Sequence, residues 1–171
     1  MRTYEDAVKE YSDISEHLPT LKRLASKCSH ITEFGVRTGN STLALLAGLP
    51  RGGTLVSYDI NDCSDAVDNH EGKWKFKQAD TSKLFLIDKT DMLFIDTLHD
   101  YAQVVDELQH ALAVRKYIVF HDIVLFGCND ESTGKGPGIM MAILEFLRDN
   151  KSWVVQEVYP NNNGLLVLVK Q

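Results

Sequence analysis

The 171-residue chain has few of the residues that define several classes of protein. It has only three cysteines, an odd number at wide spacing, so neither a disulfide framework nor a zinc cluster is expected. No apolar run approaches the ~20 residues that cross a bilayer, and the first residues lack the apolar stretch of a signal peptide. We therefore expect a cytoplasmic protein with free thiols and no membrane contact; the cysteines are Cys28, Cys63 and Cys128.

Positive charge is also scarce, because the formal net charge is −6 and no basic stripe is visible. A protein that wraps a nucleic-acid backbone needs such a stripe, so we expect no nucleic-acid partner. The length suggests one domain spanning 1–171, with a helical N-terminal cap over 1–28 and a core over 29–171.

The core alternates between two hydrophobic periodicities. Strand-like runs fall at 30–34, 54–59, 74–80, 91–96 and 116–122, and again at 152–159 and 164–170. Helical patterns fall at 4–28 (broken near Pro19), 41–49, 63–71, 81–87, 101–114 and 138–150. This alternation predicts an α/β fold, with a Rossmann-like, doubly wound, mostly parallel seven-stranded sheet. Helices should cover both faces, and the last two strands should form an antiparallel hairpin.

Acidic or imidazole side chains stand at the carboxyl ends of the first five expected strands. Ligands of doubly wound sheets bind at that edge, so these groups predict a small-molecule site there. In strand order the groups are Glu33, Asp59, Asp80, Asp96 (followed by His99) and His121-Asp122.

The first strand leads into the stretch EFGVRTGNST, residues 33–42. Gly35 and Gly39 permit a positive φ and a close approach of backbone to ligand. Ser41 or Thr42 can cap the helix that follows. A dinucleotide fingerprint would carry a glycine where Arg37 stands, which argues against a pyrophosphate. The alternative is an ordinary strand–helix turn.

Asp59 ends the second strand, about 20 residues beyond the glycines, where an acid commonly grips the two ribose hydroxyls. The alternative for Asp59 is a solvated turn residue.

Together, EFGVRTGNST, then YD and then QAD resemble the class I S-adenosylmethionine-dependent methyltransferases. The resemblance implies that Glu33, Gly35 and Gly39 border the methionine part of S-adenosylmethionine. It implies that Asp59 takes the ribose hydroxyls and that Ala79 and Asp80 edge the adenine. We add four neighbours to this cofactor site: Arg37, Ser41, Ile60 and Asp96.

The second half of the core, LFIDTLHDYAQVVDEL and then YIVFHD, is similar to metal-dependent O-methyltransferases. That similarity implies that Asp96 and Asp122 hold Mg²⁺, which would make a bound hydroxyl a better nucleophile. Ile123 stands where those enzymes usually have a third oxygen ligand. The third ligand would then either be missing or come from His121, Asn129 or Asp130.

His99 and His121 are candidate general bases, since imidazole titrates near neutral pH. Each also has a structural interpretation. His99 could serve only in local hydrogen bonding near a helix start, and His121 could be a buried partner at the end of the sheet. Other features are assigned structural roles. We expect His17, His30, His70 and His110 at the surface or on helix faces, and a solvated helix face at 106–110. Met140 and Met141 are expected in the core, and Trp74 and Trp153 in the core or on a sheet face.

The combined prediction is a methyltransferase that acts on an oxygen of a small molecule. Two alternatives stay open: a non-catalytic methyltransferase-like module that binds cofactor or a partner, and a nucleotide-dependent oxidoreductase. The chain is short and offers only the segments 1–28 and 123–137 as lid candidates. We therefore also expect a second copy of the chain to complete the pocket, which would make the protein a homo-oligomer.

Overall fold

The computed structural model describes residues 2–68 and 72–171. Its strands are β1 (His30–Phe34), β2 (Thr54–Asp59), β3 (Trp74–Gln78), β4 (Thr90–Ile95), β5 (Val114–His121), β6 (Trp153–Tyr159) and β7 (Leu165–Lys170). They form one sheet in the order β3-β2-β1-β4-β5-β7-β6. The first five run parallel, and β7 pairs antiparallel with both β5 and β6. The predicted α/β fold with a closing hairpin is confirmed.

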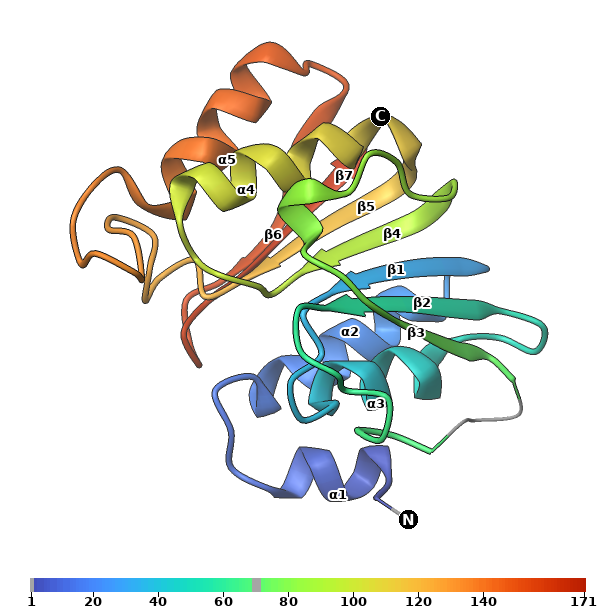
Figure 1. Ribbon diagram of the computed structural model, residues 1–171. Coiled ribbons are helices and arrows are strands. Elements are labelled where there is room, and N and C mark those ends of the chain that lie inside the picture. Colours follow the sequence, from blue (N-terminus) through green and yellow to red (C-terminus); the bar gives the residue numbers. More distant parts are fainter. Residues whose placement is uncertain (1, 69–71) are drawn as a thin grey trace.

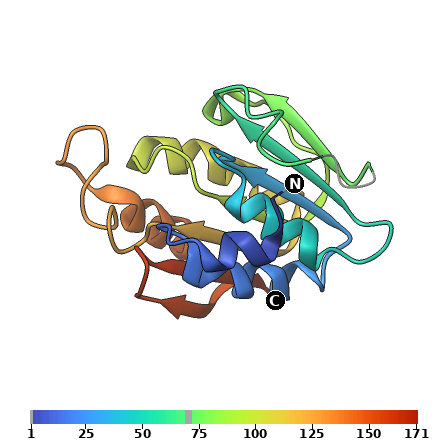
Figure 2. The same cartoon turned by 90° about the horizontal axis from the view of Figure 1, so that it is seen from below.

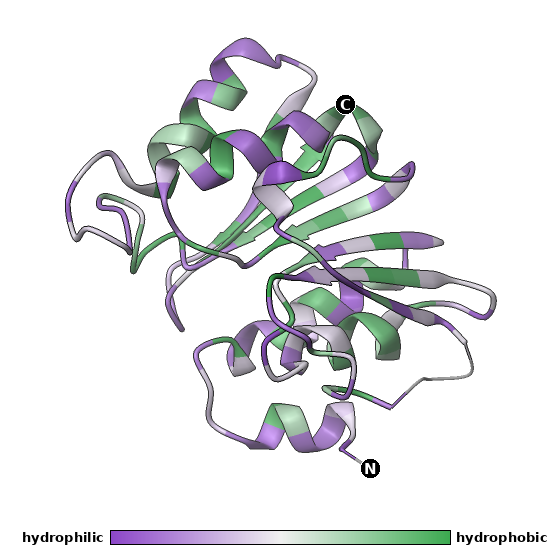
Figure 3. Cartoon of the chain, in the orientation of Figure 1, coloured by the Kyte–Doolittle hydropathy of each residue, from purple (hydrophilic) through white to green (hydrophobic). Residues whose placement is uncertain are grey.

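Helices cover both faces of the sheet, as Figures 1 and 2 show. On one face lie α1 (Tyr4–Lys9), α2 (Leu18–Ala25) and α3 (Asn40–Gly48); on the other lie α4 (Tyr101–Leu108) and α5 (Gly138–Asp149). Short 3₁₀ turns are η1 (Ser15–His17), η2 (Thr81–Lys83) and η3 (Gln109–Ala113). The apolar side chains form two buried clusters, one for each face. Figure 3 shows hydrophobic residues in green on the strands and on the helices that cover them.

Burial explains why these segments fold as they do. All six residues of β4 are buried, as expected for a central parallel strand with helices on both sides. In α2 the buried residues recur at helical spacing, and Pro19 stands at the start of the helix, where its missing N–H costs nothing. A new helix therefore begins next to Pro19, as predicted, and the chain also leaves helical structure earlier, between α1 and η1.

Other element boundaries also differ from the prediction. The helix expected over 63–71 is absent from the described residues of that range, which form turns and bends, and residues 69–71 with His70 lie outside the described part. The helix expected over 81–87 shrinks to η2, and the third strand ends at Gln78. Residues 63–71 and 81–87 lack a continuous apolar stripe, so no face holds a helix against the core.

Several side-chain predictions are corrected as well. His17 and His110 are buried rather than at the surface, and Met141 is exposed rather than in the core. The segment 106–110 is not a solvated face, because Glu107 and Leu108 are buried. Trp74 and Trp153 are buried as predicted. Within the described residues, helices that combine the length and the apolarity needed to cross a membrane are absent.

Candidate functional site

Two neighbouring cavities open where the five parallel strands end. The larger, about 350 Å³, lies at the tips of β2, β3 and β4 and is called here the β2–β3 cavity. The smaller, about 190 Å³, lies at the tips of β4 and β5 beside the N-terminal segment and is called the β4–β5 cavity. The two share a wall made of Gly35, Arg37, Asp96 and Thr97. The sheet therefore gathers most of the predicted residues around two joined spaces, whereas Glu33, Gly39 and His121 line neither of them.

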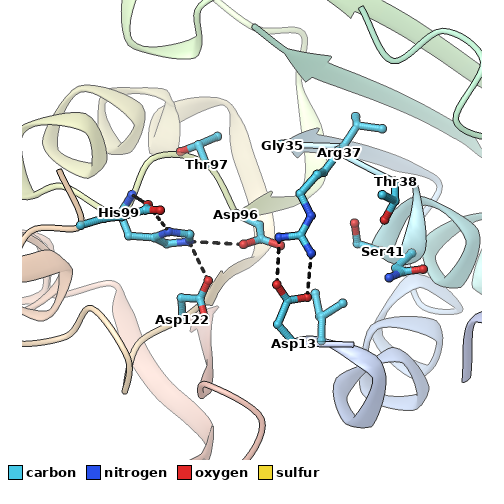
Figure 4. Close-up of a pocket in the computed structure, with 13 residues that line it drawn as sticks. Asp13, Gly35, Arg37, Thr38, Ser41, Asp96, Thr97, His99 and Asp122 are labelled. Atoms are coloured by element: carbon cyan, nitrogen blue, oxygen red, sulfur yellow. Dashed lines mark hydrogen bonds and ion pairs between the residues drawn. The ribbon is translucent and has the colours of Figure 1, made fainter. Parts of the chain in front are cut away.

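The loop after β1 forms most of the shared wall. Gly35 has φ +89°, and a Cβ at that position would lie 1.9 Å from the carbonyl oxygen of Asp96. Only glycine permits β1 and β4 to approach so closely there. Arg37 also has a positive φ, 48°, an uncommon conformation for a residue with a side chain. This backbone turns the Arg37 side chain across the β4–β5 cavity (Figure 4).

Glu33 lies beneath that loop, outside the set of residues that line the two cavities. Its carboxylate is fully buried and accepts hydrogen bonds from Ser41 Oγ at 2.7 Å, Thr42 Oγ1 at 2.9 Å and Ser57 Oγ at 2.5 Å. Burial raises the pKa of Glu33 to about 7, although the hydrogen bonds from the three hydroxyls act to lower it. The expected helix cap from Ser41 or Thr42 is wrong, because both hydroxyls turn inward and Gly39 occupies the cap position. Glu33 thus joins β1, β2 and α3 below the site.

Asp59 holds the same loop from the other side. Its Oδ2 accepts the backbone N–H groups of Val36 at 2.8 Å and Arg37 at 3.1 Å, and its Oδ1 accepts that of Asn61 at 2.9 Å. Burial pushes the pKa of Asp59 upward, but these backbone donors outweigh it and lower the pKa. The carboxylate also lines the β2–β3 cavity.

The far wall of the β2–β3 cavity contains Ile60, Ala79 and Asp80. Asp80 caps η2 through Ser82 and forms an ion pair with Lys83 at 2.6 Å. Ile60 and Leu98 leave apolar surface at the rim, with 64% and 46% of each residue exposed. This cavity combines an apolar rim with a carboxylate at one end, which suits a flat ring joined to a polyol.

Three acid or imidazole groups meet at the tips of β4 and β5 (Figure 4). His99 Nε2 lies 3.3 Å from Asp96 Oδ1 and 3.1 Å from Asp122 Oδ2. Burial would raise the pKa of Asp96, but hydrogen bonds from His121 and His99 lower it. Burial would lower the pKa of His99, but Asp96 and Asp122 raise it.

A divalent cation fits these three residues. One ligand atom from each of Asp96, His99 and Asp122 lies within 4.8 Å of the others. Asp122 Oδ1 is buried and has no hydrogen-bond partner among the described residues. Asp122 has a positive φ of 59°, so the backbone is turned sharply at this position. An acceptor oxygen without a donor, beside a second carboxylate, is what a bound cation would satisfy.

His121 lies deeper than His99. It is 1% exposed, its Nε2 donates to the carbonyl oxygens of Asp13 and Asn162, and its Nδ1 faces Asp96 at 3.2 Å. Burial would lower the pKa of His121, but Asp122 and Asp96 raise it to about 10. Both ring nitrogens are therefore engaged by the protein, and the ring orients Asp96.

Sequence reasoning missed three acids that shape the site. Asp13 forms an ion pair with Arg37 at 2.8 Å across the β4–β5 cavity, and Glu131 accepts a hydrogen bond from His99 at 2.9 Å. Both lie on the two segments that were expected to serve as lids, 1–28 and 123–137. Glu107 lies behind the β2–β3 cavity. Glu107 follows Val104 by three residues and so lies on the apolar stripe of α4. That spacing could have indicated from the sequence that its side chain is buried.

Comparison with known proteins gives a consistent picture. Residues 32–123 match the family described as Methyltransferase domain. A search of curated proteins gives no match. Among solved structures, the fold is similar to the O-methyltransferase from Bacillus cereus in complex with SAH, at 16% identity and TM-score 0.67, covering 98% of this chain and 90% of that one.

Two further structures extend the likeness. One is the O-methyltransferase TomG from Streptomyces achromogenes in complex with SAM, at 15% identity and TM-score 0.69, covering 95% of this chain and 82% of that one. The other is the N-methyltransferase NodS from Bradyrhizobium japonicum in complex with S-adenosyl-L-homocysteine, at 14% identity and TM-score 0.68, covering 95% and 90%. Since the family match spans more than half of the sequence, the chain belongs to the methyltransferase domain family.

Proposed function

We propose that this methyltransferase moves a methyl group from S-adenosylmethionine to an oxygen of a small molecule, with Mg²⁺ bound at the site. The observation that carries the proposal is the shared wall of the two cavities. A nucleoside in the β2–β3 cavity would direct its sulfonium past Gly35 and Asp96. The methyl group would then face an acceptor in the β4–β5 cavity, and such alignment is most of what methyl transfer needs.

The cofactor assignment follows the polarity of the walls. The carboxylate of Asp59 accepts hydrogen bonds from the ribose hydroxyls, while Ile60, Ala79 and Asp80 border the adenine. Around the methionine part lie Gly35, Arg37 and Ser41, with Gly39 at the N-cap of α3 and Glu33 supporting the loop from below.

Arg37 is the cation available to the methionine carboxylate among the described residues that line the β4–β5 cavity, and it would exchange its ion pair with Asp13 for that ligand.

Asp96 and Asp122 hold the cation in this proposal, and the bound metal would make an acceptor hydroxyl more acidic. His99 accepts the proton, since its Nε2 faces both carboxylates and Glu131 fixes the opposite nitrogen. His121 keeps Asp96 in position. Acids predominate in this cavity, which favours a cationic occupant: Asp13, Asp96, Asp122 and Glu131 line it together with Arg37.

The test of the cofactor is calorimetric titration with S-adenosylmethionine and S-adenosylhomocysteine, each with and without Mg²⁺. We expect both to bind, and methyl transfer from labelled cofactor to simple catechols and sugar hydroxyls to require the cation. Absence of binding by both compounds would contradict the proposal. Binding without transfer to any hydroxyl acceptor would favour the non-catalytic alternative.

His99→Gln separates a base from a metal ligand. As a base, His99 contributes typically 10²–10⁴-fold to the rate, so kcat should fall by that order while Mg²⁺ affinity measured by calorimetry stays within about twofold. A parallel loss of Mg²⁺ binding would make His99 a ligand instead.

The proposal also includes a cytoplasmic location and a second copy of the chain closing the β4–β5 cavity. Light scattering during size-exclusion chromatography, with and without S-adenosylhomocysteine, tests the second copy. A monomer under both conditions would remove that part.

A further inference from the structure

Glu107 is a buried carboxylate that the reaction described above does not use. It lies on α4 behind the β2–β3 cavity and is 0% exposed. Its Oε2 is buried without a hydrogen-bond partner among the described residues, and burial raises its pKa despite the donors around it. Neighbouring stripe positions on the helix are apolar, such as Val104 and Leu108. A carboxylate there costs stability that an apolar residue would not, so it calls for another explanation.

Three side chains of the cavity wall turn their donors toward this carboxylate. Glu107 Oε1 accepts from Thr81 Oγ1, from Thr97 Oγ1 at 2.8 Å and from Gln103 Nε2 at 2.8 Å. Gln103 Nε2 also donates to Thr81 Oγ1 at 2.9 Å. The three come from the segments after β3 and β4 and from α4 itself, and all of them line the β2–β3 cavity. One buried group therefore fixes the direction of the hydrogen bonds that these three side chains make.

The consequence concerns what the wall can offer a ligand. A carboxylate accepts hydrogen bonds and donates none, so it selects the amide nitrogen of Gln103 and leaves the carbonyl oxygen for the cavity. No described group donates to that oxygen. The hydroxyls of Thr81 and Thr97 likewise donate their hydrogen bonds to Glu107, so toward the cavity they can only accept. The wall presents hydrogen-bond acceptors to whatever occupies the cavity.

We infer that Glu107 is a positioning residue that makes the nucleoside cavity select a 6-amino purine over a 6-oxo purine. This inference rests on the proposed binding of an adenosyl cofactor in the β2–β3 cavity. Adenine carries a donor at its 6-position and hypoxanthine an acceptor, so the oriented Gln103 carbonyl pairs with the first and repels the second. Replacing the carboxylate by an amide would let Gln103, Thr81 and Thr97 reverse their hydrogen bonds.

The experiment compares the affinities of S-adenosylhomocysteine and S-inosylhomocysteine by calorimetry. The wild-type chain should prefer the adenosyl compound by about 10- to 100-fold, the effect of one mismatched hydrogen bond in a partly buried site. Glu107→Gln should bring the two affinities within about threefold. Because a merely structural role would weaken both ligands equally, the ratio is the decisive readout.

A second variant covers the case in which Glu107→Gln does not fold. Gln103→Leu removes the oriented carbonyl at a half-buried position and should also erase the preference. Gln109→Leu, an exposed exchange at the start of η3, should retain it. Equal wild-type affinities, or a full preference in Gln103→Leu or in a folded Glu107→Gln protein, would overturn the inference. A wild-type chain that binds neither compound would instead overturn the proposed cofactor and, with it, this selectivity.

Discussion

Asp59 shows how one side chain serves both the loop and the ligand. Three backbone N–H groups converge on its carboxylate, so the glycine loop is ordered before any cofactor arrives. The same carboxylate faces the β2–β3 cavity. An asparagine cannot accept at both ends, because its NH₂ group would oppose one of the backbone donors.

We therefore expect Asp59→Asn to weaken S-adenosylhomocysteine binding by about 1–3 kcal/mol, the range for hydrogen bonds to a charged group. Calorimetry measures this, with Asp62→Asn on the exposed turn nearby as the control. Unchanged affinity in Asp59→Asn would mean that the ribose lies elsewhere.

Glu33 predicts a pH dependence of stability. Its pKa is raised from 4.5 to about 7 in the folded state, so the folded chain holds a proton that the unfolded chain has lost. Stability should then fall as pH rises from about 4.5 to about 7, by an amount on the order of 3 kcal/mol, and level off above.

Glu33→Gln should remove that slope, because the amide does not titrate. Urea unfolding between pH 5 and pH 8 gives the free energy of unfolding, and Glu5→Gln on the exposed side of α1 provides the control. A variant with the wild-type slope would show that Glu33 is ionised throughout the range.

At the scale of elements, α2 and α3 approach so closely that one glycine decides their packing. A Cβ on Gly48 would lie 2.2 Å from the carbonyl oxygen of Lys22 and 2.7 Å from Ala25 Cβ. Alanine normally stabilises a helix relative to glycine by about 1 kcal/mol. Here the overlap should reverse the sign.

Gly48→Ala is expected to destabilise the fold by about 1–3 kcal/mol, the range for overpacked cores. Its control is Ala47→Gly on the exposed side of α3, which should cost about 1 kcal/mol through helix propensity alone. Chemical denaturation measures both. Greater stability in Gly48→Ala would show that the two helices separate freely.

The strands and their acidic ends were predictable because both signals are local. Each strand is a short apolar run, and parallel strands must end at one edge, so the sequence alone places Asp59, Asp96 and Asp122 together. The polar contacts that join distant segments were not predictable. Asp13 contacts Arg37, and Glu131 contacts His99, only because distant parts of the chain fold against each other. Neither contact produces a periodic pattern in the sequence from which it could be predicted.

Helices were predictable where an apolar stripe was continuous, as in α2 and α5. Residues 63–68 and 81–87 carry too few apolar positions to hold a helix, so tertiary structure decided their conformation. Glu107 was misread for a related reason: its charge suggested solvent, whereas its position on the stripe of α4 directed it inward.

For the whole molecule, cofactor binding should appear as stabilisation. The two cavities are built from β1, β2, β3, β4, β5 and the N-terminal segment, so a ligand that fills them joins both halves of the sheet. At about 100 times its dissociation constant, a ligand stabilises the folded state by about 2.7 kcal/mol.

S-adenosylhomocysteine should accordingly raise Tm by roughly 5–10 °C for a chain of this size, as followed by differential scanning calorimetry. Adenosine alone should give a smaller rise, because it leaves the methionine side of the site empty. No shift at millimolar ligand would argue against a formed site.

The central claim is that a sulfonium nucleoside spans the two cavities across Gly35 and Asp96. A crystal structure of the chain with S-adenosylhomocysteine tests it most directly. The account predicts the ribose on Asp59, the adenine between Ile60 and Ala79, and the sulfur at the shared wall. Density for the nucleoside anywhere else, for instance in the groove between α4 and α5, would contradict it.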